Sequence, residues 1–135
     1  MKVTGRCHCG QITYEAEVDP ATVTICHCTD CQQLTGTAWR AGVPTLPDTF
    51  RLTGTPKTYI KTAASGRKRL HAFCSECGSP IYATSTDPDP SIVGLRLGGI
   101  DQRAQFTYPK RQIWCQSALM WARDLWMIPR SNDPF

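Results

Sequence analysis

The sequence has no long apolar run, no internal repeat and no low-complexity tract. A spanning helix needs about 20 consecutive apolar residues, and no segment approaches that length. The first residues, Met1–Arg6, lead directly into a cysteine motif without the apolar segment that opens a secretory signal. These absences predict a soluble cytoplasmic protein with no membrane partner.

Helix-forming patterns are also scarce. The segment 30–34 predicts a short helix that ends at Gly36, and 118–125 predicts a second, weaker one. With 135 residues the chain has the size of one domain, expected to cover 1–135 and to bury a core without crosslinks. The net charge of +4 is compatible with an anionic small substrate and with nucleic acid, so it does not discriminate between these two kinds of partner.

Most of the chain shows the pattern of short strands. Apolar and polar residues alternate over Ile12–Val18, which predicts a half-buried strand that ends at Asp19-Pro20. Turn-forming Gly and Pro residues separate further candidate strands at 23–26, 37–43, 49–52, 57–62, 69–73, 80–84, 92–97 and 113–115. The sequence therefore predicts a mainly β protein.

Seven of the eight cysteines fall into three clusters: Cys7-His8-Cys9-Gly10, Cys26-His27-Cys28-Thr29-Asp30-Cys31 and Cys74-Ser75-Glu76-Cys77-Gly78. In a reducing compartment such clusters indicate metal ligation or redox chemistry rather than disulfides, which are the alternative. The form of Cys74-x-x-Cys77-Gly78 is that of a zinc knuckle, which needs a second pair of thiolates to complete a tetrahedron. Cys7 and Cys9 are the natural source of this second pair of thiolates.

The three remaining clustered cysteines, Cys26, Cys28 and Cys31, would then leave a fourth zinc position open for water or substrate, as catalytic sites do. Spacing leaves two alternatives: these three share a centre with another ligand in a purely structural protein, or the thiolates hold an iron–sulfur cluster.

Three ordered motifs resemble the glutathione-dependent formaldehyde-activating enzyme (GFA) family. They are Gly5-Arg6-Cys7-His8-Cys9-Gly10, Cys26-His27-Cys28-x-Asp30-Cys31-Gln32 with Thr35-Gly36, and Phe73-Cys74-x-x-Cys77-Gly78-Ser79-Pro80-Ile81-Tyr82. The resemblance continues through Gly99-Ile100-Asp101 and Ile113-Trp114 to Trp121, and so covers nearly the whole chain.

This resemblance implies a β-tent fold of short antiparallel strands and two Zn²⁺ ions per chain. It implies a structural ion on Cys7, Cys9, Cys74 and Cys77 and a catalytic ion on Cys26, Cys28 and Cys31. It also implies a carbon–sulfur lyase whose partners are a small thiol, glutathione, and an aldehyde, formaldehyde. A departure from the family is Cys115, the one cysteine outside the motifs. We expect it to be a buried thiol, with a position near the open zinc or a redox partnership with that site as the alternative.

Other polar and aromatic residues have ordinary interpretations. We expect His8 and His27 to point away from the metals and His71 to be structural. Asp30 is either a proton acceptor at the open site or a stabiliser of the helix start. The run Arg67–Arg69 is expected at a solvated hairpin end, with a substrate carboxylate as the alternative partner. The four tryptophans are expected in the core or at an interface, and 87–90 in a surface turn.

Two other function classes compete with the enzyme. One is a non-catalytic zinc-binding module that acts in protein contacts or metal handling. The other is nucleic-acid binding, which is disfavoured because no basic stripe is interleaved with aromatic residues. Thiol-dependent turnover at an accessible zinc site would separate the enzyme from the module.

Overall fold

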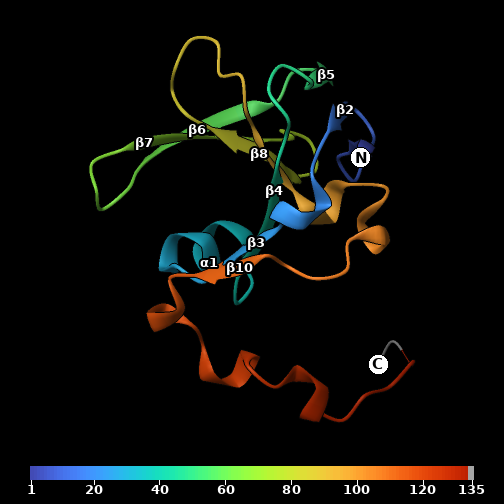
Figure 1. Ribbon diagram of the computed structural model, residues 1–135, viewed down its shortest axis with the longest axis vertical. Coiled ribbons are helices and arrows are strands. Elements are labelled where there is room, and N and C mark those ends of the chain that lie inside the picture. The colour runs from blue at the N-terminus through green and yellow to red at the C-terminus, as the bar shows by residue number, and fades with distance from the viewer. Residues whose placement is uncertain (134–135) are drawn as a thin grey trace.

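A computed structural model describes residues 1–133 and is built mainly from strands, as the sequence predicts (Figure 1). In this range there are ten strands and one α-helix, α1 at Thr29–Thr35. The strands are Lys2–Arg6 (β1), Thr13–Glu17 (β2), Thr24–Cys26 (β3), Arg40–Pro44 (β4), Arg51–Thr53 (β5), Lys57–Thr62 (β6), Lys68–Phe73 (β7), Pro80–Thr84 (β8), Gly94–Arg96 (β9) and Arg111–Ile113 (β10). No helix among the described residues is long and apolar enough to cross a bilayer.

The strands form two sheets. The small sheet has the order β1-β2-β5, and the large sheet has the order β10-β3-β4-β9-β8-β7-β6. Neighbouring strands run antiparallel, as expected, except that β10 pairs in parallel with β3. This parallel pair brings the chain near residue 113 alongside the end of β3, where Cys26 lies.

The hydrophobic core lies where the small sheet meets the middle of the large one. Its most deeply buried side chains come from both sheets and the loops between them: Val3, Val18, Val23, Val43, Ile81, Leu95 and Ile100. The alternation of β2 places Tyr14 and Ala16 in this core and Glu15 in solvent, as the sequence pattern predicts. Two cysteines, Cys7 and Cys74, belong to the same buried cluster.

Strand boundaries differ from the sequence prediction at identifiable residues. The segments 57–62 and 80–84 match β6 and β8, whereas β1 is missing from the prediction. At the other end of the large sheet, β10 stops at Ile113 because Trp114 adopts a left-handed conformation with φ of 57°. A continuous strand cannot include such a residue, so the predicted strand at 113–115 is displaced.

The predicted helix at 118–125 is wrong. That part of the chain forms two separate 3₁₀ turns, Met120–Ala122 and Leu125–Met127, drawn in orange to red in Figure 1. Their large apolar side chains are exposed, including Met120 and Trp126. A helix of two turns is unstable in water unless one face packs against the protein, and this segment has no buried face.

Candidate metal centres

Seven cysteines gather into two separate groups of sulfur atoms. The four-cysteine cluster contains Cys7, Cys9, Cys74 and Cys77, and the three-cysteine cluster contains Cys26, Cys28 and Cys31. Within each group all the sulfur atoms lie within 4.8 Å of one another. The structure therefore brings together the same four and the same three cysteines that the sequence grouped.

The four-cysteine cluster has the sulfur spacing of a tetrahedral metal site. The Cys9 sulfur lies 3.5 Å from that of Cys7 and 3.7 Å from that of Cys74. Zinc–sulfur bonds of about 2.3 Å in a tetrahedron place sulfurs about 3.8 Å apart, whereas a disulfide requires about 2.05 Å. The donor set therefore fits Zn²⁺ and excludes a disulfide between these pairs.

Two turns hold the four-cysteine cluster against the core. Cys7 and Cys9 follow β1, and Cys74 and Cys77 follow β7 in a turn that closes at Gly78, whose φ is 74°. The Ile12 N–H points to the Cys7 sulfur at 3.3 Å, which stabilises negative charge on it. Because Cys7 and Cys74 are each only 1% exposed, a metal ion here would extend the core.

The three-cysteine cluster is assembled by a strand, a turn and the start of a helix. Cys26 ends β3, Cys28 caps the N-terminus of α1, and Cys31 is buried in the first helical turn. The Cys31 N–H donates to the Cys28 sulfur at 3.4 Å. The helix ends at Gly36 in a left-handed conformation, as predicted. Within residues 1–133 no further Cys, His, Asp or Glu ligand atom joins this group.

The thiols of this cluster differ in their acidity. Burial raises the pKa of the Cys28 thiol, but the Cys31 N–H, the neighbouring sulfurs and the charge of Lys61 outweigh it and hold that pKa below its usual value. Burial raises the pKa of Cys31 to about 12. Three thiolates this close repel one another unless a cation lies among them. The donor set fits a divalent thiophilic metal, with three protein ligands and one open position.

A cavity of about 740 Å³ opens beside the three-cysteine cluster and reaches it at Cys28. Its wall includes Asp30, Trp114 and the end of the β6–β7 hairpin, Arg67–Arg69, which we call the basic rim. The rim is exposed at the hairpin end, as predicted. Asp30 faces Lys61, with 2.6 Å between its Oδ2 and the lysine Nζ, and it lies in the first turn of α1.

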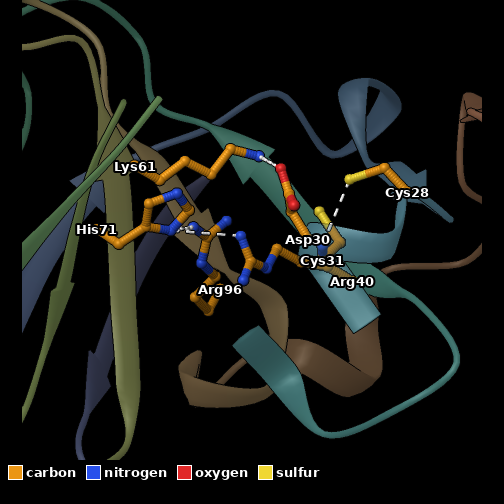
Figure 2. A network of polar contacts seen from close by, with 7 residues as sticks. All are labelled: Cys28, Asp30, Cys31, Arg40, Lys61, His71 and Arg96. Atoms are coloured by element: carbon orange, nitrogen blue, oxygen red, sulfur yellow. Dashed lines mark hydrogen bonds and ion pairs between the residues drawn. The ribbon is translucent and has the colours of Figure 1, made fainter. Parts of the chain in front are cut away.

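Behind the cluster two arginines converge on one histidine (Figure 2). Arg40 of β4 and Arg96 of β9 each direct an N–H to His71 Nδ1, at 3.4 and 3.1 Å. Burial and then the charges of Arg96 and Arg40 lower the pKa of His71 to about 4. The imidazole is therefore neutral near pH 7 and accepts from both guanidinium groups, which gives it the structural role that the sequence suggested.

The other histidines lie outside both clusters, as expected. His8 is exposed, while His27 is buried with its Nε2 at 2.7 Å from Gln112 Oε1.

The expectation of a buried Cys115 is wrong, because it lies exposed in a 3₁₀ turn that follows the left-handed Trp114. Three of the four tryptophans are exposed and so lie outside the core, which leaves the interface position as the prediction for them: Trp114, Trp121 and Trp126. The segment 87–90 is an exposed bend, apart from its half-buried Pro90.

Sequence reasoning missed three basic residues near the three-cysteine cluster: Lys61, Arg40 and Arg96. A signal was present for the two arginines, since each interrupts an apolar strand segment, Trp39-Arg40-Ala41 and Leu95-Arg96-Leu97. A charged residue in such a strand is rarely buried without a partner. Lys61 carries no comparable signal, because it lies between Ile60 and Thr62 in a strand that already contains a second lysine, Lys57.

Comparison with known proteins identifies one protein family. The family model described as glutathione-dependent formaldehyde-activating enzyme matches residues 2–117. Curated protein sequences yield no match. Among solved structures, the crystal structure of a Rhodobacter sphaeroides protein, a Northeast Structural Genomics target, is similar with a TM-score of 0.57 and 20% identity. The similarity covers 78% of this chain and 97% of that chain, and at this identity it supports the fold alone.

Proposed function

Because the chain belongs to the glutathione-dependent formaldehyde-activating enzyme family, we propose that it is a zinc-dependent carbon–sulfur lyase of thiol–aldehyde adducts. The proposed reaction forms S-hydroxymethylglutathione from glutathione and formaldehyde. One observation carries the proposal: a cluster of three cysteines, with no fourth protein ligand among the described residues, lies at a cavity lined with basic residues. Eight free cysteines suit a reducing compartment, and so we place the protein in the cytoplasm.

The two clusters would hold two ions with different tasks. Cys7, Cys9, Cys74 and Cys77 would hold a structural Zn²⁺, and Cys26, Cys28 and Cys31 would hold the catalytic one. When bound with an open position, zinc can stabilise a thiol as its thiolate or polarise an aldehyde oxygen. The protein's part is to fix three sulfurs in place through β3 and α1 and to leave one side open.

The reaction forms one carbon–sulfur bond. The thiol sulfur attacks the formaldehyde carbon and the π bond of the carbonyl breaks. The carbonyl oxygen takes up one proton to become the hydroxyl, which balances the proton that the thiol gives up. A cavity of about 740 Å³ falls within the size range of small-ligand sites. The basic rim lines the same cavity as Cys28, so it would receive the carboxylates of glutathione while the thiol sulfur approaches Cys28.

The test is the rate of S-hydroxymethylglutathione formation, followed by exchange NMR with and without the zinc-loaded protein. The uncatalysed reaction is spontaneous, so the excess over buffer is the measured quantity. We expect Cys26→Ala, Cys28→Ala and Cys31→Ala each to abolish this excess, because each leaves two ligands where three are needed. Cys115→Ala, which removes a thiol outside both clusters, is the matched control and should retain it.

The opposing result is a wild-type protein with its full zinc content that gives no excess rate across a range of thiols and aldehydes. In that case the chain is a zinc-binding module without catalysis.

A further inference from the structure

Two arginines lie next to the three-cysteine cluster without a carboxylate partner. Arg40 is only 8% exposed, and on β4 it lies directly opposite Cys26 of β3. Residues opposite one another on neighbouring strands share a face of the sheet. Within residues 1–133 the ion pair of the structure is Lys61–Asp30, so neither Arg40 nor Arg96 is neutralised by an acidic side chain.

The hydrogen bonds of the two guanidinium groups are incomplete as well. Both donate to the same neutral acceptor, His71 Nδ1. The Nε atoms of Arg40 and Arg96 are buried, and neither has a hydrogen-bond partner among the described residues. Figure 2 shows the two groups side by side between His71 and Cys31. Two like charges buried together are costly unless negative charge lies close to them.

The sulfurs of the three-cysteine cluster supply that negative charge. Burial and then the charge of Arg40 lower the pKa of Arg96, to about 9, whereas thiolate charge on Cys31 and Cys26 acts in the opposite direction. The arginines and the sulfurs are therefore close enough to affect each other's charge.

A charge count shows what this arrangement favours. Three thiolates and one divalent ion leave a single negative charge, which would disfavour an anion in the open position. With the guanidinium groups of Arg40 and Arg96 included, the net charge of thiolates, ion and arginines together becomes a single positive charge. An anionic ligand brings the total to zero, whereas a neutral ligand leaves a buried charge uncompensated.

We propose that Arg40 and Arg96 make the three-cysteine centre select an anionic ligand, such as a thiolate, over a neutral one of the same shape. This inference rests on the proposed function in that it takes a divalent ion on Cys26, Cys28 and Cys31. The arginines act as positioning residues through the electrostatic potential of the site. On binding, a neutral thiol releases its proton to solvent and enters as the anion.

The experiment compares two ligands of nearly the same size that differ in net charge and in one terminal group. Acetate and acetamide have the same shape, and their binding to the Co²⁺-loaded protein is followed by visible absorption, which responds to the ligands of the metal. We expect the ratio of the acetamide to the acetate dissociation constant to fall about tenfold in Arg40→Gln and in Arg96→Gln. Glutamine retains an N–H donor for His71 but carries no charge.

The matched control is Arg51→Gln, which removes an exposed arginine on the small sheet and should leave the ratio within about twofold of wild type. The conservative variants Arg40→Lys and Arg96→Lys keep the charge and should largely keep the ratio. A ratio that is unchanged in both glutamine variants overturns the proposal. If those variants do not fold, equal binding of acetate and acetamide by the wild-type protein overturns it.

This readout separates the inference from the proposed function. A shifted ratio without thiol-dependent turnover supports the anion preference and removes the enzymatic proposal. Turnover with an unchanged ratio overturns the anion preference alone. Uptake of a single Co²⁺ per chain contradicts both.

Discussion

Lys61 Nζ lies 2.6 Å from Asp30 Oδ2, and this contact joins the helix that carries Cys31 to the hairpin that carries the basic rim. Lys61 on β6 pairs with Arg69 on β7. The rim is therefore held in a fixed relation to the three-cysteine cluster by the ion pair and by the strand ladder. The same contact gives Asp30 a structural partner, in line with the interpretation that it stabilises the start of α1.

We predict two zinc ions per chain. The sulfur spacing of the four-cysteine cluster fits a closed site, and the three-cysteine cluster fits an open one. Metal analysis of protein prepared without chelator measures the stoichiometry directly. A maximum of one zinc, or the absorption spectrum of an iron–sulfur cluster, contradicts the two-site interpretation.

The two sites should differ in their effect on folding. Cys74→Ala removes a buried ligand of the four-cysteine cluster and should abolish the cooperative thermal transition, because metal binding at a closed site contributes directly to folding. Cys28→Ala should leave a folded chain with one zinc. It also loses a helix cap, worth about 1 kcal/mol, which lowers Tm by a few degrees.

Cys28→Ser is the matched control for the second variant, because serine caps a helix but makes a poor zinc ligand. It should lose the zinc and keep the stability. Equal losses of Tm in Cys74→Ala and Cys28→Ala would show that the two clusters do not have different roles.

Removing the charge of the basic rim should weaken the binding of glutathione specifically. The triple variant Arg67→Gln, Lys68→Gln, Arg69→Gln should raise KM for glutathione about three- to tenfold, as expected for exposed ion pairs. The KM for 2-mercaptoethanol, which has no carboxylate, should not change. An equal rise for both thiols would mean that the rim supports the fold and does not bind substrate.

His71 should make stability depend on pH. Its pKa is about 4 in the folded chain against 6.5 as the ordinary value, so the unfolded chain binds more protons between these limits. The free energy of unfolding should therefore fall as the pH falls through this window. The slope for this one group cannot exceed about 1.4 kcal/mol per pH unit, which is the limit for one titrating proton.

Comparing wild type with His71→Gln isolates this effect. The free energy of unfolding is measured in urea at pH 7 and pH 5.5, and the zinc content of both proteins is verified. Glutamine can still accept from Arg40 and Arg96 but does not titrate. The variant should lose less stability than wild type on acidification. The exposed His8 provides the control, since His8→Gln should behave as wild type.

Cys115 should be the first thiol to react with iodoacetamide in the zinc-loaded protein. It is exposed and belongs to neither cluster, whereas the other seven sulfurs would be metal ligands. Mass spectrometry should find one modification per chain, and none in Cys115→Ser. Modification at Cys28 before Cys115 would mean that the three-cysteine cluster does not hold its metal.

The fold class and the three-cysteine cluster could be predicted because both depend on local patterns. Alternating polarity marks β2, and the short spacings of Cys26, Cys28 and Cys31 already confine their sulfurs to one turn. The strand β1 could not be predicted in this way, because Lys2–Arg6 contains a single large apolar residue, Val3, and owes its place to pairing with β2.

The proximity of Arg40 and Arg96 could not be predicted from the sequence, for a different reason. Arg40 and Arg96 are 56 positions apart in the printed sequence and meet only because β4 pairs with β9. The exposure of Cys115 likewise follows from one backbone conformation, that of Trp114. A contact between distant strands, or the conformation of one residue, does not appear as a periodic pattern in the sequence and so could not be predicted from it.

The two metal clusters are nested along the chain. Cys9 and Cys74 approach within 3.7 Å across a separation of 65 residues, and the whole three-cysteine cluster lies inside the loop that they close. An ion at the outer cluster therefore acts as a crosslink that reduces the conformational entropy of the chain around the inner one. This topology favours one order of metal binding. An ion bound first at the four-cysteine cluster restricts the chain around the three-cysteine cluster, whereas an ion bound first at the three-cysteine cluster leaves the large loop unrestricted.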